Sequence, residues 1–262
     1  MGQFGRCVTA FATAIGLGAC SVSNRPTVVA RDAVLRSQPV YLYAAADSTR
    51  PPRALVFFFG NDIGFWRPHR KLASVLAGSQ YAVAGFDIRP LLGSLPDRIP
   101  QRDSAFAARI EPIIARARHE LGADTVPLII AGHSLGAEIA IWTAAHVCAP
   151  GTVGVLALSP GSRSHLRVSL SDIMNGPEPT GPESFSVPAT IAAVPPDERV
   201  AIIRGLRDDY AKFDSALLAA GGNRIQRYAI PFSGHSLKGL AMASFEVRRA
   251  LDWILGGMSA RR

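Results

Sequence analysis

The stretch Ile129–Ala137 reads IIAGHSLGA and decides the fold, because it joins an apolar run to a helix-compatible segment through a Gly-x-Ser-x-Gly turn. A short apolar run of this kind is typical of a buried strand. Ser134 stands at the apex of the turn, where a tight strand–helix connection strains the backbone. Side chains at Gly132 or Gly136 would collide with the neighbouring strand or helix. The pattern indicates a nucleophile elbow; the alternative is a glycine-rich turn whose serine has no chemical role.

A serine hydroxyl becomes a nucleophile when a base takes its proton, and the base needs an acid to orient it. In elbow enzymes the chain order is Ser, then Asp or Glu, then His. His235 follows an expected strand at 225–230 and precedes the last helix, so it is the candidate base. His146 lies on the helix that leads away from the elbow, and we expect a polar surface role for His165.

The acid is sought after the expected strand at 200–204, where two aspartates are adjacent. Either carboxylate could reach the histidine. We choose Asp208 as the acid, and expect Asp209 to cap the helix that follows. Asp214 is expected to be solvated within that helix. Asp172, in the lid segment, is a less favoured candidate for the acid.

Backbone amides are expected to bind the oxyanion of the transition state. The amide of Leu135 lies at a helix N-terminus and is the first candidate donor. The second is the amide of Asn61, in the loop GNDIGFW at 60–66, where Asp62 is expected to brace the loop. No metal-ligand pattern or cofactor motif stands out, so neither a metal nor a cofactor is expected.

Strand-like and helix-like segments alternate along the chain. Strands are expected at 40–44, 54–59, 81–86, 128–131, 153–158, 200–204 and 225–230. Asp103 is expected to cap a helix that Pro112 kinks or breaks. The alternation predicts an α/β fold with a mostly parallel sheet covered by helices on both faces. The segment 160–198, rich in Pro, Ser and Gly, interrupts it and predicts a small lid over the pocket.

The N-terminus reads as a targeting segment. Residues 1–19 carry one positive side chain and an apolar run too short to span a bilayer stably. The sequence LGAC at 17–20 resembles the lipobox of bacterial lipoproteins, which predicts cleavage before Cys20 and lipidation of that cysteine. A polar tether at 20–27 would then lead into a domain at 28–262, held on the extracytoplasmic face of a bacterial cell envelope. An ordinary secretory signal cut near the same point is the alternative.

Composition narrows the class of protein. Hydrophobic residues make up 48% of the chain, enough for one domain with a sizeable core. The net charge of +8 is scattered, without a nucleic-acid-binding motif, so no nucleic-acid partner is expected. A basic surface of this kind suits anionic phospholipid headgroups. Once the signal is removed and Cys20 is acylated, Cys148 has no partner for a disulfide, and it is expected to be buried.

These motifs together resemble the α/β-hydrolase superfamily over about residues 54–255. The sequence GHSLG at 132–136 resembles the nucleophile motif of that superfamily, GLRD at 205–208 its acid turn and GHS at 234–236 its histidine loop. The resemblance implies the α/β-hydrolase fold and a serine hydrolase with the triad Ser134, Asp208 and His235.

Three further stretches look most like bacterial VirJ/AcvB-type proteins: FGNDIGFW at 59–66, LSPG at 158–161 and LSDIM at 170–174. Those exported hydrolase-like proteins are linked to cleavage of aminoacyl-phosphatidylglycerol. The resemblance therefore implies hydrolysis of a carboxylic or aminoacyl ester, small or lipid-borne, through an acyl-enzyme. An amide or polymer ester is a variant of this reading. The alternative from another class is a catalytically idle lipoprotein that binds a lipid or a protein partner in the same cleft.

Overall fold

A seven-stranded sheet forms the centre of the molecule in the computed structural model, which describes residues 25–174, 176–236 and 244–259. The strand order is β1-β3-β2-β4-β5-β8-β9, with β1 antiparallel to β3 and the other pairs parallel. The strands are β1 (Val40–Tyr43), β2 (Leu55–Phe59), β3 (Ala82–Phe86), β4 (Leu128–His133), β5 (Thr152–Leu158), β8 (Arg199–Gly205) and β9 (Ile225–Ile230). The mostly parallel sheet that the sequence predicts is confirmed.

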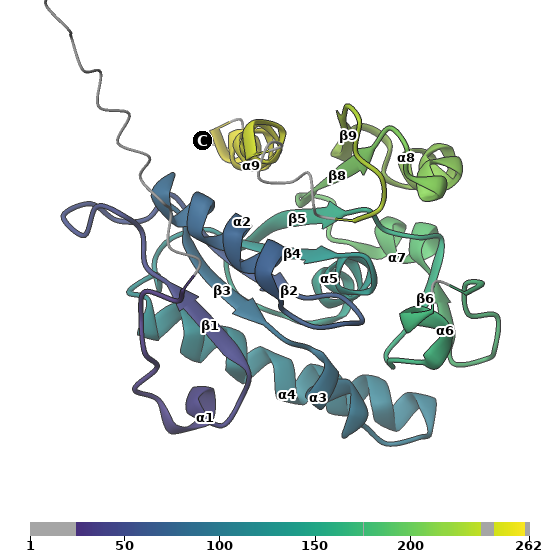
Figure 1. The fold of residues 1–262 in the computed structure, drawn as a ribbon, viewed down its shortest axis with the longest axis horizontal. Helices are drawn as coiled ribbons and strands as arrows, with labels where there is room; N and C mark the ends of the chain where they lie inside the picture. The colour runs from purple at the N-terminus through teal and green to yellow at the C-terminus, as the bar shows by residue number, and fades with distance from the viewer. Residues whose placement is uncertain (1–24, 175, 237–243, 260–262) are drawn as a thin grey trace, which may run out of the picture.

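Helices cover both faces of this sheet (Figure 1). The helices α2 (Arg67–Gly78) and α9 (Ser244–Ser259) pack on one face. The opposite face carries α1 (Ala33–Arg36), α3 (Arg89–Gly93), α4 (Ile99–Glu120), α5 (Leu135–His146), α7 (Val187–Ala193) and α8 (Asp214–Gly221). The two short 3₁₀ helices are η1 (Asp209–Phe213) and η2 (Gly222–Arg224). Two helix layers therefore enclose the sheet.

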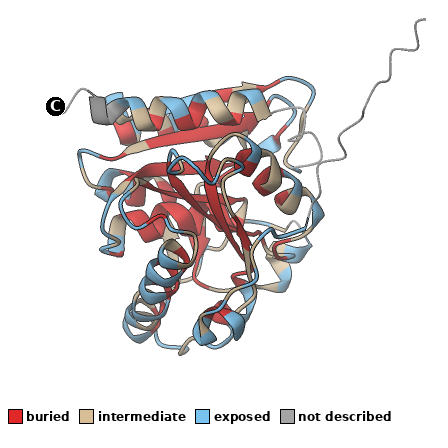
Figure 2. Ribbon diagram, turned by 90° about the vertical axis from the view of Figure 1, so that its left-hand side faces the viewer, coloured by how far each residue is buried: buried red, intermediate tan, exposed pale blue. Residues whose placement is uncertain are grey.

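The central strands are apolar throughout because both of their faces are covered. Every residue of β2, β3 and β4 is buried, and Figure 2 shows the sheet as a buried layer between helices with exposed outer faces. Successive side chains point to opposite faces, so Phe57 and Phe59 join one half of the core and Phe58 joins the other. An uninterrupted apolar run in the sequence thus contributes side chains to the core on both faces of the sheet.

Two local expectations are wrong, and a third, a break at Pro112, is wrong in part. The helix expected after Asp103 begins at Ile99, because Pro100 fits the first turn of a helix and leaves Asp103 inside it. Pro112 does not break this helix, whose apolar stripe is packed against the sheet on both sides of the proline. Cys148 is exposed rather than buried, since it lies beyond the last turn of α5.

The segment expected as a lid divides into two parts. Residues 162–186, here named the insertion, leave the sheet after β5 and contain the ribbon strands β6 (Arg163–His165) and β7 (Ser184–Ser186) with the short helix α6 (Leu170–Ile173) between them. The remainder of the segment includes α7, whose Val187 and Ile191 are fully buried against the core. The lid candidate is therefore shorter than 160–198, because α7 belongs to the helical layer.

The predicted signal at 1–19, Cys20 and most of the tether lie outside the described residues. Within the described ranges, no helix combines the length and apolar character of a membrane span. Lipidation of Cys20 thus stays a prediction.

Candidate active site

Ser134 sits on a strained turn between β4 and α5. Its φ of 53° and ψ of −125° place it in the left-handed half of backbone space, which non-glycine residues rarely adopt. A Cβ at Gly132 would lie 1.9 Å from the Gly136 carbonyl oxygen, and one at Gly136 would lie 2.1 Å from that of Gly60. Both glycines are therefore required, and the turn projects the hydroxyl beyond the end of the sheet.

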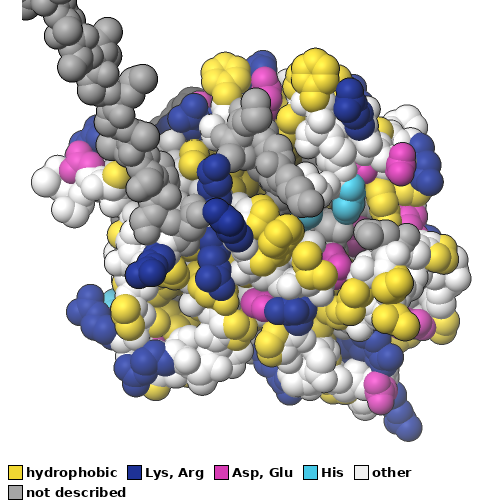
Figure 3. Space-filling model, in the orientation of Figure 1, with side chains coloured by type: hydrophobic (Ala, Val, Ile, Leu, Met, Phe, Trp, Pro, Cys, Tyr) yellow, Lys and Arg dark blue, Asp and Glu magenta, His cyan; other side chains and the backbone are white. Residues whose placement is uncertain are grey.

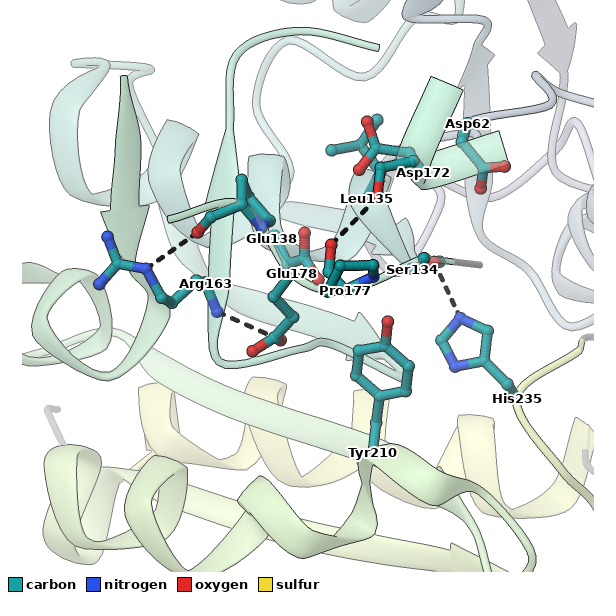
Figure 4. A pocket seen from close by; sticks show the side chains of 13 residues that line it. Asp62, Ser134, Leu135, Glu138, Arg163, Asp172, Pro177, Glu178, Tyr210 and His235 are labelled. Carbon is teal, nitrogen blue, oxygen red and sulfur yellow. Dashed lines mark hydrogen bonds between the residues drawn. The ribbon is translucent and has the colours of Figure 1, made fainter. Parts of the chain in front are cut away.

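The structure brings Ser134, His235 and Asp208 together from three separate strand ends. His235 Nε2 lies 2.9 Å from Ser134 Oγ (Figure 4), and His235 Nδ1 lies 3.3 Å from Asp208 Oδ1. With the ring proton on Nδ1, the carboxylate accepts that N–H and Nε2 accepts the serine hydroxyl. The geometry allows the serine proton to pass to the histidine.

The other two histidines after the elbow lie elsewhere. His146 packs on Trp142 near the C-terminal end of α5. His165 is not a surface residue: it is buried in the insertion, where its Nε2 lies 2.9 Å from Asp172 Oδ2. Asp172 is thereby engaged with His165 and is not the partner of His235.

Asp208 is buried, and its carboxylate accepts hydrogen bonds from three residues. Besides His235, its carboxylate accepts the Tyr210 amide at 3.0 Å and the Arg204 guanidinium at 3.0 Å. Burial alone would raise the pKa of Asp208, but the hydrogen bonds from His235 and Tyr210 and the charge of Arg204 hold it well below its ordinary value. Asp208 therefore stays ionised over the physiological pH range.

Asp208 also caps η1, which is the role that the sequence analysis gives to Asp209. Asp209 is exposed, so that expectation is wrong. Asp214 is not solvated either. It is buried and accepts hydrogen bonds from Arg204 at 2.9 Å and from Arg227 at 3.1 Å.

Arg204 is a site residue that the sequence analysis misses. It is 1% exposed, at the end of β8, and its guanidinium also donates to the Pro160 carbonyl at 2.7 Å. It thus ties together the acid turn, α8 and the end of β5. The signal for it is an arginine inside the apolar run AIIRG at 201–205. A buried charge of that kind requires charged or hydrogen-bonding partners.

His133 fixes the histidine loop from behind the elbow. Burial lowers the pKa of His133 to about 3, so the ring is neutral, and its Nε2 donates to the His235 carbonyl at 2.9 Å. His69, also buried, packs on it with ring centroids 5.4 Å apart. The tie from β4 to the His235 backbone holds the loop at the correct distance from Ser134.

The two amides expected to bind the oxyanion lie beside the elbow. Leu135 is the first residue of α5, with its N–H at the positive end of the helix dipole. Asn61 follows Gly60, whose carbonyl oxygen abuts Gly136. The Asn61 carbonyl accepts the Gly64 amide at 2.8 Å across a tight turn. The roles of the two amides in catalysis stay predictions.

Four carboxylates line the pocket in front of Ser134: Asp62, Glu138, Asp172 and Glu178. Asp62 thus faces the pocket as well as belonging to the loop that it is expected to brace (Figure 4). Arg163 is the one arginine or lysine among the described lining residues. The pocket is therefore strongly acidic, although the chain as a whole is basic.

The charge of these carboxylates differs with their surroundings. Glu138 accepts the Gly161 amide at 2.7 Å, yet burial raises its pKa to about 8, assisted by Glu178 and Asp172. Burial also raises the pKa of Asp62. For Asp172, burial is outweighed by hydrogen bonds from His165 and Ser169, which lower its pKa. A cation entering the pocket would favour ionisation of the whole group.

Glu178 joins the later part of the insertion to its first residues. Its carboxylate accepts the Ser162 amide and hydroxyl and, at 3.3 Å, the Arg163 amide. A Cβ at Gly161 would lie 2.3 Å from Glu178 and 2.9 Å from Glu138. The two carboxylates thus close around one glycine. The sequence analysis does not find this pair, because the two residues lie 40 positions apart (178 − 138).

Comparisons with known proteins show the fold. No family model and no curated protein matches the sequence. The structure is similar to a candidate dienelactone hydrolase from Klebsiella pneumoniae, with 15% identity and a TM-score of 0.60 over 83% of this chain and 92% of that chain. It is also similar to Est1E from Butyrivibrio proteoclasticus, with 13% identity and a TM-score of 0.58 over 84% of this chain and 94% of that chain.

A soluble variant of monoglyceride lipase from Saccharomyces cerevisiae, in complex with a substrate analogue, is 14% identical, with a TM-score of 0.57 over 83% of this chain and 91% of that one. At such identities the likeness concerns the fold. The elbow, the sheet order and these matches lead to one conclusion: this chain has the α/β-hydrolase fold.

Proposed function

We propose that this protein is a serine esterase. The observation that carries the proposal is the series of contacts from Ser134 Oγ to His235 Nε2 at 2.9 Å and from His235 Nδ1 to Asp208 at 3.3 Å. A strained serine with a base in reach and an ionised acid behind that base is the arrangement required for nucleophilic attack on an acyl group. The hydrolases and esterases that share the fold support the same reaction class.

The proposed reaction proceeds in two halves. Ser134 Oγ bonds to the ester carbonyl carbon while His235 takes the hydroxyl proton, and the amides of Leu135 and Asn61 bind the oxyanion. Collapse breaks the bond to the alcohol, which leaves with the proton from His235. Water then attacks the acyl-enzyme, His235 takes its proton and returns it to Ser134, and the carboxylic acid departs.

A fluorophosphonate probe tests this proposal. The probe should label Ser134, as mapped by mass spectrometry, and the Ser134→Ala variant should remain unlabelled. Hydrolysis of short acyl esters should then be abolished by prior labelling. A folded protein that neither reacts with the probe nor cleaves any ester would favour the idle, ligand-binding alternative.

The acyl group is proposed to be cationic, as in an aminoacyl ester. The support is the acidic lining: Glu138, Glu178, Asp172 and Asp62 all face the pocket, so a protonated amine would find anionic partners there. A neutral fatty acyl chain would gain nothing from these groups, since a buried carboxylate without a counter-charge is unfavourable.

A panel of matched esters tests the acyl group. Alanyl and lysyl esters should be cleaved faster than their N-acetylated counterparts with the same alcohol, and aminoacyl-phosphatidylglycerol should be a substrate. Equal rates for free and acetylated amines would contradict the aminoacyl proposal and indicate an esterase without selectivity for a cationic acyl group.

A lipid anchor at Cys20 is proposed for the location of the enzyme in the cell envelope. It is supported by the LGAC sequence at 17–20, which is followed by a polar stretch. Mass spectrometry of the mature N-terminus should find an acylated Cys20, and Cys20→Ala should release the protein from membranes or leave its precursor uncut. An unmodified terminus at another residue would leave an ordinary secreted protein.

A further inference from the structure

Most of the large apolar side chains that are exposed in the described residues lie on the segments around the pocket. Leu170 is 74% exposed, Met174 70% and Phe232 84%. With them we group, as the pocket rim, Ile63, Ile173 and Leu206, which are exposed as well. Single exposed apolar residues are ordinary, but a group of them at one site marks an interaction surface.

The rim residues are neighbours of the site in structure. Ile63 adjoins Asp62, and Leu170 and Met174 belong to the segment of the insertion that carries Asp172. Leu206 and Phe232 lie on the acid turn and the histidine loop. These two segments are joined by the Arg207 amide, which donates to the Ser233 carbonyl at 2.8 Å, and by the Leu206 amide, which donates to the Ile230 carbonyl at 3.0 Å. Four segments thus place apolar groups near the Ser134–His235 pair.

Cations accompany these apolar groups. Arg207 is exposed on the acid turn, beside the exposed Asp209, and its guanidinium lies 5.7 Å from the centroid of the Phe232 ring. Arg67 is exposed at the start of α2, four positions after Ile63. On the face that carries the visible histidine, Figure 3 shows hydrophobic side chains together with Lys and Arg and with Asp and Glu side chains. Apolar side chains combined with arginines match the acyl and headgroup layers of an anionic membrane, and the chain carries a net charge of +8.

We propose that the pocket rim docks on an anionic phospholipid membrane, with its apolar side chains in the interfacial layer and Arg67 and Arg207 on the lipid phosphates. Docking of this face points the opening of the Ser134 pocket at the lipid surface. An ester bond at the headgroup level then reaches the serine without the lipid leaving the bilayer. The face makes this contact whether or not the N-terminus carries an anchor.

Fluorescence quenching tests the orientation without relying on catalysis. Leu170→Trp and Phe232→Trp, in the full chain, are mixed with phosphatidylglycerol vesicles whose acyl chains carry bromine. Val34→Trp is the matched control, because Val34 is also exposed but lies on α1, across the molecule from α6 (Figure 1). Beyond the wild-type signal, quenching at the rim positions should exceed that at the control about threefold, and should weaken on brominated phosphatidylcholine. Equal quenching at rim and control would overturn the proposal, as would equal response to the two lipids.

Kinetics supply a second test, and this arm rests on the proposed esterase function. The triple variant Leu170→Ser/Met174→Ser/Phe232→Ser should keep kcat/KM for a water-soluble ester within about twofold, and lose about tenfold or more for the same ester carried in anionic vesicles. Val29→Ser/Val34→Ser, the matched control, should change neither value. Equal losses on both substrates, or no loss on vesicles, would contradict docking by the rim. Absence of any hydrolysis by the wild type would remove the esterase proposal and leave the quenching result as the test of docking.

Discussion

Two buried carboxylates of the site have opposite properties: Asp208 accepts a hydrogen bond from His235, and Glu138 lines the pocket. Asp208 is held ionised, because His235, Tyr210 and Arg204 all direct hydrogen-bond donors or positive charge at it. Burial, assisted by neighbouring carboxylates, raises the pKa of Glu138 to about 8, although the Ser164 hydroxyl and the Gly161 amide act in the opposite direction. Both residues are buried, at 4% and 7% exposed, and the hydrogen bonds and charges around Asp208 outweigh the burial that dominates at Glu138. The ionised Asp208 serves proton transfer through His235, whereas Glu138 belongs to the group of pocket carboxylates that a bound cation would ionise. These two parts are called the proton-transfer side and the acidic side.

The largest expected effect is on the proton-transfer side. Ser134→Ala and His235→Ala should each lower kcat/KM by about 10³-fold or more, because the nucleophile or its base is lost. Ester hydrolysis and thermal unfolding are measured together, and Tm should change little. A variant that retains more than a tenth of the wild-type activity would remove its residue from the mechanism.

Asp208→Asn should lower kcat by at least about 10²-fold, somewhat less than loss of the serine or histidine, since the amide cannot orient the imidazole as a carboxylate does. Asp209→Asn is the matched control, and should stay within about twofold because Asp209 is exposed. Steady-state kinetics on one soluble ester measure both. If Asp209→Asn is the more damaging change, the acid is assigned to the wrong residue.

On the acidic side, the expected effect is selectivity. Glu138→Gln should reduce the preference for a 6-aminohexanoyl ester over its neutral isostere, a heptanoyl ester, by about tenfold. Glu183→Gln, in the insertion but not lining the pocket, should leave the preference unchanged. In the wild type the preference should rise as pH increases through about 8 and Glu138 ionises. The glutamine variant should lack this rise, and a wild-type preference that does not vary with pH would contradict the role of Glu138.

The remaining expected effects are on stability rather than on rate or selectivity. A carboxyl whose pKa is higher in the folded state stabilises the fold at low pH, and this contribution disappears as pH rises from about 4.5 to about 8. For Glu138 it amounts to at most about 5 kcal/mol. Between pH 5.5 and 8.5, Tm should therefore fall more steeply for the wild type than for Glu138→Gln. Parallel curves would place Glu138 in a more polar environment.

For Asp208, the contribution to folding stability changes with pH in the opposite direction. The pKa of Asp208 is lower in the folded state, so its contribution is fully present above the unfolded value of 3.8 and is lost only as pH falls from there through the much lower folded-state pKa. The stability difference between Asp208→Asn and the wild type should consequently be largest at neutral pH and should shrink steadily below pH 3.8, down to the lowest pH at which the protein stays folded. Chemical denaturation at several pH values measures this, and a constant difference would show that Asp208 acts through shape alone.

Much of the fold follows from local sequence. Runs such as LVFFF at 55–59 and the glycines at 132 and 136 each permit few conformations, so strands, elbow and layer order can be derived from the chain itself. The residues Ser134, Asp208 and His235 were found in the same way, because each follows a recognisable strand. The errors at Asp103 and in the length of the lid concern element boundaries, which depend on packing against the remainder of the core.

Local sequence accounts for the doubly covered parallel sheet, the strained serine and the order of the candidate triad, because backbone sterics and apolar periodicity act over a few residues. Which carboxylates lie next to each other depends on the folded arrangement of distant segments. Arg204 and Asp214 are buried together, His165 engages Asp172, and Glu138 meets Glu178 across the pocket. Charge on a side chain depends on what lies within a few ångströms of it, and the chain brings those neighbours from distant positions. The acidity of the pocket in a basic protein is therefore a property of the fold.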